Sequence, residues 1–375
     1  MPDSKVEPLR IGLVGAGAIM RLSHAPVITR SCETELVAVF DRDRGRAEAI
    51  TAEFGGKPFD ELEAMLDKGG VDAVIVATPN RFHGEGVIAA AGRGKHVLCE
   101  KPLDLDIAES RRMVDACEKA GVVLQVGFNQ RFWGQVQIAK ALLDAGFIGK
   151  VHQMRSIYSE KSTAYPAVTN YRYDLAQSGG ATIIDLTIHR IDLARHLVGD
   201  FSGIFAELAH SEMQEKVDDN VWLLTRFENG ARGCLSSNRY SPAIGDGTDL
   251  YGTEGTIHIA SETLNPFMAA PLAVYTEKSA KDLPEILREA HYPDAWWKGF
   301  EGGWITVKPP RRSPYEAQLK SFCDAIRAGR LAEITGLDGL KAQEVVQAAY
   351  LSMHSGGWVD IPLARDAPFI VPVYA

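Results

Sequence analysis

Short apolar runs alternate with stretches of helical periodicity through the first 127 residues, and this alternation limits the folds that the chain can adopt. Such runs are typical of buried strands, and the stretches between them have the spacing of amphipathic helices. Strands that alternate with helices predict a parallel, doubly wound sheet, which binds ligands beyond the carboxyl ends of its strands. The expected strands are 9–14, 35–40, 71–77, 96–99 and 122–126, and the expected helices are 44–54, 82–92 and 108–120, with another through residue 28 after the first strand.

The pattern changes after Gly127. Short strands in series, joined by turns such as Glu228-Asn229-Gly230, predict an antiparallel sheet. Because 375 residues exceed the size at which one hydrophobic core usually stops growing, we expect two domains, an α/β domain over 1–127 and an α+β domain over 128–375. In the second domain the expected strands are 151–159, 201–210, 220–227, 231–239 and 248–259, and the expected helices are 136–145, 181–198, 315–328 and 337–353.

Composition and charge exclude several classes of partner. The formal net charge of −9 disfavours nucleic acid and anionic membrane surfaces. No apolar run approaches the roughly 18 residues that a membrane span needs, and no spacing typical of metal ligands occurs. The five cysteines are scattered without a C-x-x-C pair, which favours reduced thiols and a cytoplasmic protein.

A glycine-rich turn, residues 15–20, follows the first expected strand. Gly15 would allow a tight turn, and Gly17 would let the backbone approach a pyrophosphate at the N-terminus of the next helix. Ala18 and Ile19 complete this candidate cofactor-binding turn. A methionine stands where the usual fingerprint has a third glycine or an alanine, so we expect a wider contact between helix and strand with the phosphate cradle intact. The turn predicts a bound dinucleotide, NAD or NADP.

Asp41 ends the second expected strand. Its carboxylate could accept hydrogen bonds from the hydroxyls of the adenosine ribose, which favours NAD because a 2′-phosphate would be repelled. Arg42 favours NADP instead, since a guanidinium beside the acid could bind that phosphate. NAD is therefore the favoured cofactor, and NADP stays open. Asp43 and Arg44 are expected to lie in a solvated loop that caps the next helix.

Thr78-Pro79-Asn80 follows the expected strand 71–77. Here the chain would pass beneath the nicotinamide ribose, so Thr78 and Asn80 are candidate cofactor contacts. Asn80 could instead cap the helix that begins near Phe82. His83, in the first turn of that helix, is interpreted as a structural hydrogen-bonding residue.

Glu100-Lys101-Pro102 follows the expected strand 96–99. By itself the tripeptide is typical of a solvated turn, but after this series of strands and helices a lysine at the strand end would face bound nicotinamide. Lys101 is therefore a candidate catalytic, cofactor-binding and substrate-binding residue. Glu100 is a candidate cofactor contact.

Several tracts, in this order and spacing, resemble the Gfo/Idh/MocA family of oxidoreductases, whose members include inositol dehydrogenases and glucose-fructose oxidoreductase. The resemblance covers nearly the whole chain. It implies that 1–127 is an NAD(P)-binding Rossmann domain, and that 128–375 is a substrate-binding and oligomerisation domain with a large, open, mostly antiparallel sheet. It also implies hydride transfer between nicotinamide and a sugar, an inositol or a related polyol. The tracts are 15–19, 77–80 with His83, 100–102, 127–129 and 179–185 running on to His189.

Asp185 and His189 lie four residues apart on the expected helix 181–198 and so share one face of it. A carboxylate beside an imidazole raises its basicity and fixes its tautomer, while Lys101 nearby would counter that rise and stabilise an alkoxide. His189 would remove the hydroxyl proton as hydride leaves the carbon, and Lys101 would polarise the same oxygen. Asp185 would orient the base or bind a neighbouring hydroxyl. By spacing alone, such a pair is more often a surface pair.

Further candidates for substrate contact precede the glycines at 179 and 180 or follow the last strand of the first domain. Family members often carry an aromatic-Arg-x-Asp segment that Arg172 and Asp174 resemble. Tyr173, Asn129 and Arg131 also suit a polyhydroxylated ligand, because they offer hydrogen bonds or a flat face.

Two further features of the second domain are not assigned to the catalytic site. Asp192 and Arg195, three residues apart on the expected helix, predict a structural ion pair. The aromatic-rich segment 291–304 is expected to be a loop that covers the pocket, meets a neighbouring subunit or plugs the sheet.

These residues together predict an NAD(P)-dependent dehydrogenase that acts on a sugar or polyol hydroxyl. One alternative is glycoside cleavage by transient oxidation with tightly held NAD. The other is a nicotinamide-binding regulatory protein, which the intact set of Lys101, Asp185 and His189 disfavours. A homodimer or homotetramer through the C-terminal sheet is expected by family analogy.

Overall fold

The computed structural model describes residues 7–161, 171–212, 217–241, 245–260, 271–289, 299–310, 312–364, 367–368, 370 and 374. The chain divides into two compact units. The first comprises residues 1–129, 176–179 and 313–343, and the second comprises residues 130–175, 180–312 and 344–375.

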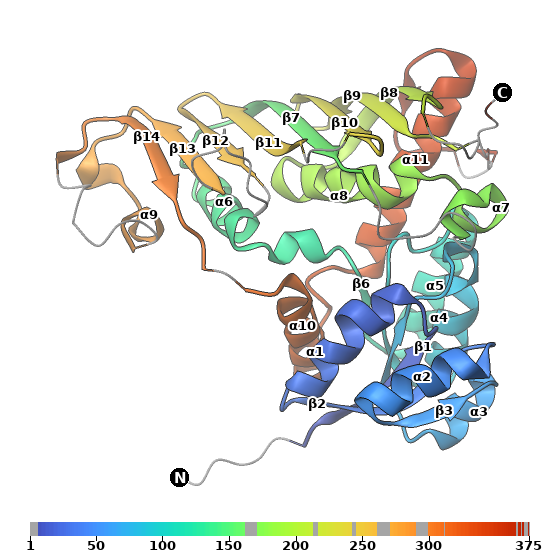
Figure 1. The fold of residues 1–375 in the computed structure, drawn as a ribbon. Coiled ribbons are helices and arrows are strands. Elements are labelled where there is room, and N and C mark those ends of the chain that lie inside the picture. Colours follow the sequence, from blue (N-terminus) through green and yellow to red (C-terminus); the bar gives the residue numbers. More distant parts are fainter. Residues whose placement is uncertain are drawn as a thin grey trace, which may run out of the picture. The chain divides into compact units, whose positions relative to one another are not determined.

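The first unit contains a six-stranded sheet in which neighbouring strands run parallel. The order β3-β2-β1-β4-β5-β6 means that the chain winds from β1 to one edge and then returns to β4 to wind to the other (Figure 1). Doubly wound sheets bind ligands beside this reversal. The structure confirms the predicted fold class. The strands are β1 Leu9–Val14, β2 Thr34–Phe40, β3 Lys57–Phe59, β4 Ala73–Val76, β5 His96–Cys99 and β6 Leu124–Val126.

Three of the described helices of this unit begin at a side chain that caps them. Asp43 accepts the backbone N–H of Gly45 at the start of α2, as expected, and Asp106 accepts that of Ala108 at the start of α5. Gly121 ends α5 in the left-handed conformation. The helices are η1 Met20–His24, α1 Ala25–Arg30, α2 Arg44–Phe54, α3 Leu62–Lys68, η2 Asn80–Phe82, α4 His83–Ala91, α5 Ile107–Ala120 and α10 Pro314–Ala328, while η3 Asn129–Phe132 and α11 Gly336–Ser355 contain residues of both units.

Helix α10 belongs to the first unit although it lies near the end of the chain. Its residues Leu319 and Phe322 join Ile11, Leu13 and Ile28 in one buried cluster. The expected division at residue 127 places this helix in the other domain. An amphipathic helix buries its apolar stripe against whichever surface is available, and its position in the sequence does not determine that surface.

The second unit contains a nine-stranded sheet in the order β14-β13-β12-β11-β7-β10-β9-β8-β15. Its strand pairs are antiparallel except for β7 with β10, which confirms the expected mostly antiparallel sheet. The strands are β7 Val151–Ser159, β8 Phe201–Ala209, β9 Asn220–Phe227, β10 Arg232–Asn238, β11 Gly245–Gly252, β12 Gly255–Ile259, β13 Leu272–Thr276, β14 Gly303–Val307 and β15 Val359–Asp360.

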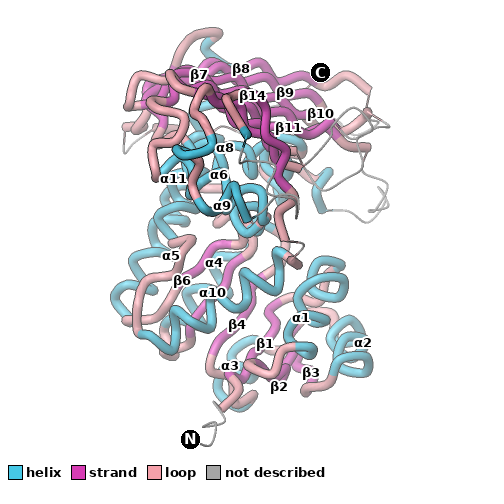
Figure 2. The backbone as a smooth tube through the Cα atoms, turned by 90° about the vertical axis from the view of Figure 1, so that its left-hand side faces the viewer, coloured by secondary structure: helices cyan, strands magenta, loops and turns pink. Residues whose placement is uncertain are grey.

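Helices α6 and α8 cover one face of this sheet (Figures 1 and 2). Strand β9 shows the resulting alternation, because Val221 and Leu223 are buried while Trp222 and Leu224 are about half exposed. One face therefore forms the core of the unit, and the other presents apolar side chains to solvent. The helices of this unit are α6 Gly134–Asp144, η5 Tyr171–Tyr173, α7 Leu175–Ser178, η6 Ile183–Thr187, α8 Ile188–Leu197, η7 Ala280–Asp282 and α9 Glu285–Glu289, of which α7 includes residues of the first unit.

Some expected elements differ from those observed. The expected strand 248–259 is two strands, β11 and β12, because the chain reverses at residues 253 and 254. The expected helix 181–198 begins as the π-helical turn η6 before α8. Trp304, expected in a loop, pairs with Tyr275 across β14 and β13, whereas residues 290–298 lie outside the described residues. The short strands β3, β13 and β15 were not expected, because so few residues carry little periodicity.

Candidate active site

The two glycines of the first turn differ in what surrounds them. Gly15 has a φ of 98°, and a Cβ on it would lie 2.8 Å from the carbonyl oxygen of Ala77. The fold therefore requires glycine at this position. A Cβ on Gly17 would meet no protein atom within 4 Å. Open space above the backbone at Gly17 is what a bound pyrophosphate needs, whereas nothing in the described fold demands a glycine there. Ala18 and Ile19 follow at the surface, and Met20 is buried in the core.

Asp41 connects the end of β2 to this turn. Its Oδ2 accepts the backbone N–H of Ala16 at 2.8 Å, and its Oδ1 accepts that of Asp43 at 2.9 Å. Each carboxylate oxygen keeps a further lone pair for a ribose hydroxyl. The position of Asp41 therefore suits the role that the sequence predicts for it.

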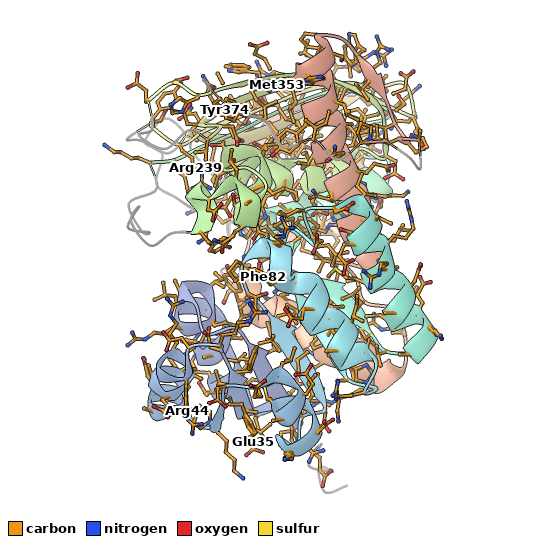
Figure 3. The ribbon with its side chains drawn as sticks, turned by 90° about the vertical axis from the view of Figure 1, so that its right-hand side faces the viewer. Glu35, Arg44, Phe82, Arg239, Met353 and Tyr374 are labelled. Carbon is orange, nitrogen blue, oxygen red and sulfur yellow. The ribbon has the colours of Figure 1, made fainter. Side chains whose placement is uncertain are left out.

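Arg42 is engaged by residues of the neighbouring helical segment. Its Nη2 lies 2.8 Å from Glu85 Oε2, and its guanidinium lies over the ring of Phe82, 5.1 Å from the centroid. Phe82 is labelled in Figure 3. These contacts hold the guanidinium by another carboxylate, an arrangement that does not favour a 2′-phosphate at this position.

Thr78 follows β4 and has an unsatisfied hydroxyl. Its Oγ1 is buried and has no hydrogen-bond partner among the described residues. Buried polar atoms usually have partners, so this hydroxyl suits a ligand contact. Asn80 is also buried, and its Nδ2 donates to the backbone carbonyl of Ser178 at 2.9 Å. The N-cap residue of α4 is Phe82, whose side chain makes no capping hydrogen bond, so a capping role of Asn80 stays a prediction.

His83 lies between two backbone carbonyls. Its Nδ1 is 2.8 Å from the oxygen of Pro102, and its Nε2 is 2.9 Å from that of Thr78. Burial lowers the pKa of its imidazole, although both contacts would favour the protonated ring. These contacts join the strand ends of β4 and β5, in agreement with the structural role expected for His83.

Glu100 and Lys101 follow β5. The Glu100 carboxylate is buried, with Oε1 2.8 Å from His24 Nε2 and Oε2 accepting the backbone N–H of Lys101 at 3.2 Å. Lys101 itself is partly exposed. Because the carboxylate is held inside the unit, a direct contact between Glu100 and the cofactor stays a prediction.

In the second unit, the carboxylate of Asp185 lies between two guanidinium groups. Arg172 Nε is 3.3 Å from Asp185 Oδ2, and Arg239 donates to the same oxygen. Arg239, labelled in Figure 3, directly follows β10 and is 2% exposed. The charge-assisted hydrogen bond from Arg239 is directional and, together with the ion pair to Arg172, it fixes the orientation of Asp185.

His189 lies one turn after Asp185, in α8, and is buried. The next residue, Arg190, forms a buried ion pair with Asp246 at 2.6 Å and lies over the ring of Tyr158, 4.5 Å from its centroid. Burial raises the pKa of the Tyr158 hydroxyl well above its usual range. Arg190 thereby anchors α8 to strands β7 and β11, and this sets the position of His189.

Asp218 caps the segment that carries Asp185 and His189. Its carboxylate accepts the backbone N–H groups of Ala181 and Ile183, each at 2.7 Å. Burial raises its pKa to about 6. The start of the helical segment is therefore held by a residue far along the chain.

The expected ion pair between Asp192 and Arg195 is wrong. Asp192 Oδ2 instead accepts from Arg131 Nε at 2.8 Å, and Arg195 Nη2 lies 2.8 Å from Asp200 Oδ1. The guanidinium of Arg131 is 6% exposed and Asp192 is 1% exposed, so tertiary burial determined the pairing. A substrate contact by Arg131 stays a prediction, as does one by Asn129 at the start of η3. The side chain of Tyr173 lies outside the described residues.

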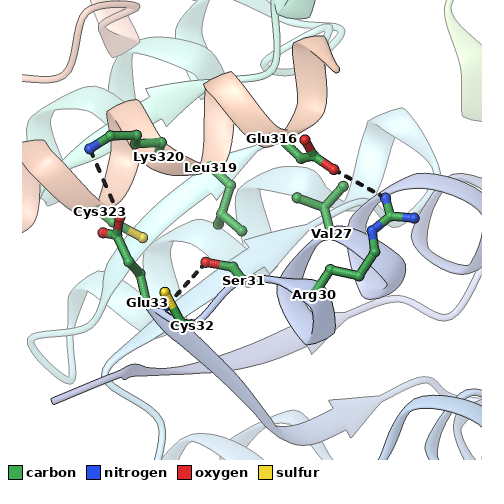
Figure 4. Close-up of a pocket in the computed structure, with 9 residues that line it drawn as sticks. All are labelled: Val27, Arg30, Ser31, Cys32, Glu33, Glu316, Leu319, Lys320 and Cys323. Carbon is green, nitrogen blue, oxygen red and sulfur yellow. Dashed lines mark hydrogen bonds and ion pairs between the residues drawn. The ribbon is translucent and has the colours of Figure 1, made fainter. Parts of the chain in front are cut away.

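A pocket of about 340 Å³ lies between α1 and α10 in the first unit (Figure 4). Its charged residues pair with one another, as Arg30 with Glu316 and Lys320 with Glu33 show. It contains none of the predicted site residues. Among the described residues, no cluster of three His, Cys, Asp or Glu side chains could hold a metal ion, and no helix is long and apolar enough to cross a membrane.

Sequence reasoning did not find several residues that contact or position the predicted residues within each unit. His24, Tyr158, Asp218, Arg239 and Asp246 each contact or position a predicted residue only through tertiary structure. The one local signal is a charged residue at the edge of an apolar strand, as at Arg239 and Asp246. That signal is common in solvated turns.

The sequence and the fold of this chain are similar to those of known proteins. Residues 9–128 match the model of an oxidoreductase family with an NAD-binding Rossmann fold, and residues 136–258 match the model of the GFO/IDH/MocA C-terminal domain. The chain is 30% identical over 365 residues to scyllo-inositol 2-dehydrogenase (NAD(+)) of Bacillus subtilis, covering 95% of this chain and 97% of that protein. The chain belongs to the GFO/IDH/MocA family of oxidoreductases.

Two further comparisons place the chain within this family. It is 33% identical to levoglucosan dehydrogenase of Pseudarthrobacter phenanthrenivorans over 80% of this chain and 83% of that protein. A solved levoglucosan dehydrogenase in complex with NADH and levoglucosan matches with a TM-score of 0.80 at 26% identity, over 95% of this chain and 100% of that one.

The first unit of this GFO/IDH/MocA protein has the NAD-binding Rossmann fold of its family, and its residues fit NAD. The open space at Gly17 leaves room for the pyrophosphate, the Asp41 carboxylate can accept from a ribose hydroxyl, and the Thr78 hydroxyl lacks a protein partner among the described residues. These features come from the strand ends where doubly wound sheets bind dinucleotides.

Proposed function

We propose that this protein oxidises a hydroxyl of a sugar, an inositol or a related polyol with NAD, or reduces the corresponding carbonyl with NADH. The observation that carries the proposal is the orientation of Asp185 by Arg172 and Arg239, one turn before the buried His189, in a chain whose first unit binds NAD. The names of the inositol and levoglucosan dehydrogenases support the same substrate class.

In the proposed reaction, Lys101, Asp185 and His189 act on one substrate. Lys101 donates a hydrogen bond to the reacting oxygen, and His189 accepts the hydroxyl proton. NAD, when bound, supplies the acceptor for the hydride that leaves the carbon. The alcohol thus becomes a carbonyl, while NADH and a protonated imidazole form. Asp185 binds a neighbouring hydroxyl or orients the imidazole, since Arg172 and Arg239 hold its carboxylate.

The remaining contacts belong to the same proposal. Asn129, Arg131, Arg172 and Tyr173 are the further candidates for substrate binding. The proposed cofactor contacts are Gly15, Gly17, Ala18, Ile19, Asp41, Arg42, Thr78, Asn80, Glu100 and Lys101. Asp41 favours NAD, and Glu85 favours it further because it engages Arg42.

The experiment is a panel of sugars, inositols and sugar lactones assayed with NAD and with NADP, with nicotinamide absorbance as the readout. We expect net NADH formation with at least one member of the panel. Glycoside cleavage by transient oxidation would consume a glycoside without net NADH release. A regulatory protein would bind NADH and turn over nothing, which would contradict the proposed function.

We also propose that copies of this chain assemble through the exposed face of the nine-stranded sheet. Ile157, Trp222 and Leu224 place large apolar side chains there, each about half exposed. Exposed apolar surface of this kind is typical of protein interfaces. All five cysteines are unpaired, which supports a location in the reducing cytoplasm.

A further inference from the structure

Two buried residues connect the glycine-rich turn to Lys101. His24 ends η1, the helical segment directly after the turn, and Glu100 directly precedes Lys101. The atoms His24 Nε2 and Glu100 Oε1 are 2.8 Å apart, and the two side chains are 4% and 11% exposed. A buried carboxylate that lost this donor would lose much of its stabilisation.

The surroundings allow the Glu100 carboxylate little freedom. Its other oxygen accepts the backbone N–H of Lys101 at 3.2 Å. A Cβ on Gly127 would lie only 3.0 Å from the carboxylate, so a side chain at this position would force the carboxylate to move. The ring of Tyr315 packs edge-on against His24, with centroids 5.3 Å apart. The pair is therefore enclosed by packing as well as joined by a hydrogen bond.

The charged and titratable groups that act on Glu100 come from several segments. They are His24 from η1, His83 from α4, Cys99 from β5 and Lys101. Burial acts to raise the pKa of Glu100, but the hydrogen bond from His24 and the charges of His24 and Lys101 outweigh burial and hold that pKa below its usual range. The carboxylate is thus ionised at neutral pH, and His24 is a main reason.

We propose that His24 is a positioning residue for Lys101. Through the Glu100 carboxylate it holds the backbone at Lys101 in a fixed place relative to the turn that receives the dinucleotide. The inference rests on the proposed role of Lys101 and deepens it. The position of the cofactor-binding turn and the position of the Lys101 amine would then both depend on the hydrogen bond between His24 and Glu100.

The test compares substitutions at His24 with one at a matched site. His24→Leu removes the donor, His24→Gln keeps an N–H at a similar distance from the backbone, and His24→Asn carries the same amide one methylene too short. Thr34→Val is the control, because it removes another buried hydrogen bond of the same unit, from Thr34 Oγ1 to the carbonyl of Ile28 at 2.9 Å. The Thr34 hydroxyl makes no hydrogen bond to Glu100 among the described residues.

Three readouts are needed. The first is the rate at which an amine-acylating reagent labels Lys101 in the NAD-free protein, followed by mass spectrometry. The second is the dissociation constant of NADH, measured by fluorescence. The third is the pH profile of kcat/KM with a substrate from the panel. The first two do not depend on turnover.

For His24→Leu, we expect the Lys101 labelling rate to change about threefold or more and NADH to bind several-fold more weakly, as the loss of one hydrogen bond to a charged group implies. The acid side of the pH profile should move to higher pH, because burial then dominates the pKa of Glu100. His24→Gln should restore most of each property, and Thr34→Val should lower the melting temperature without moving any of them.

A folded His24→Leu protein with the wild-type labelling rate, NADH affinity and pH profile would overturn the inference. If His24→Leu does not fold, His24→Gln is compared with His24→Asn. Identical labelling rates, NADH affinities and pH profiles of these two variants would also overturn the inference. If the wild-type protein oxidises no member of the panel while labelling and NADH binding respond as expected, the proposed function fails and the positioning role of His24 stands.

Discussion

At the residue scale, the glycine-rich turn separates what the fold requires from what a ligand requires. Gly15 adopts a positive φ against the carbonyl of Ala77, so its conformation and its packing both exclude a side chain. Gly17 faces open space. Glycine is therefore present at these two positions for different physical reasons, and substitution by alanine should have different effects at each.

We expect Gly15→Ala to lower the free energy of unfolding by about 1–3 kcal/mol, through backbone strain and the contact with Ala77. Gly17→Ala should change that free energy by less than about 1 kcal/mol and weaken NADH binding about tenfold, because the new methyl group occupies the space of the pyrophosphate. Thermal unfolding and NADH titration measure the two effects. Equal losses of stability in both variants would contradict this division.

The proposed catalytic residues permit a direct test at the same scale. Lys101→Ala or His189→Ala should lower kcat by roughly 10² to 10⁴, because each removes a group that polarises the reacting oxygen or accepts its proton. NADH affinity should stay within a few-fold of wild type. His354→Ala, at an exposed histidine of α11, is the control and should leave kcat unchanged. Near-wild-type turnover in either variant would remove that residue from the mechanism.

At the element scale, the connection from β5 to α5 contains two aspartates in different environments. Asp106 caps α5 from an exposed position. Asp104 is 4% exposed, its Oδ1 accepts the N–H of Leu105 at 2.7 Å, and its Oδ2 has no partner among the described residues. Burial raises the pKa of Asp104 to about 6. The loop after Glu100-Lys101-Pro102 therefore carries a carboxyl group that keeps its proton to a higher pH than an ordinary aspartate does.

This raised pKa gives a pH dependence of known sign. Because folded Asp104 binds its proton more tightly than the unfolded chain does, its contribution to stability is present below about pH 4 and is lost as pH rises through about 6. Asp104→Asn resembles the protonated side chain, so it should match wild type near pH 4 and be more stable at pH 7, by up to about 3 kcal/mol. Melting temperatures at several pH values measure the difference.

Asp106→Asn is the matched control for this prediction. It lies two residues further along the same connection, and asparagine caps helices about as well as aspartate. Its melting temperature should stay close to that of wild type at every pH. A constant difference between Asp104→Asn and wild type from pH 4 to pH 7 would show that Asp104 has an ordinary pKa.

At the scale of the whole molecule, the two sheets have different roles. The parallel sheet presents the strand ends that carry the proposed cofactor contacts, and the antiparallel sheet supports α8 on one face while large apolar side chains are exposed on the other. An exposed apolar face of this extent suits a second copy of the chain.

We expect Trp222→Asp to shift the protein toward a smaller assembly, because it places a charge in the centre of the proposed interface. Leu331→Asp is the control, since Leu331 is an even more exposed apolar residue of the first unit, outside that face. Light scattering coupled to size-exclusion chromatography measures the mass. A wild-type monomer at all concentrations would refute the assembly, and an unchanged mass for Trp222→Asp would place the interface elsewhere.

The sequence permitted accurate prediction of elements whose cause is local. The strands 9–14, 96–99, 151–159 and 220–227 and the helix 44–54 have the observed bounds, because apolar runs, caps and turns lie within the segments themselves. Asp43 is an example, since its capping role depends only on residues that follow it. The short strands β3 and β15 were not predicted, because they form only through pairing with the neighbouring strands β2 and β8.

The partners of charged residues show where prediction from sequence ended. Helical spacing favoured Asp192 with Arg195, yet Asp192 binds Arg131, whose position depends on η3. The pairing of His24 with Glu100 and of Arg239 with Asp185 likewise joins residues far apart in the chain. Burial makes such partners obligatory, and no periodicity in the sequence identifies them.

The amino-acid sequence by itself determined the alternation of strands and helices in the first unit, the antiparallel strands of the second and the place of the glycine-rich turn, because these follow from short-range periodicity and steric limits. Only the tertiary structure decided that α10 completes the core of the first unit, which buried charges pair, and that Gly17 faces open space. Those outcomes depend on the surfaces that remain to be covered once the elements pack, and packing is a property of the whole chain.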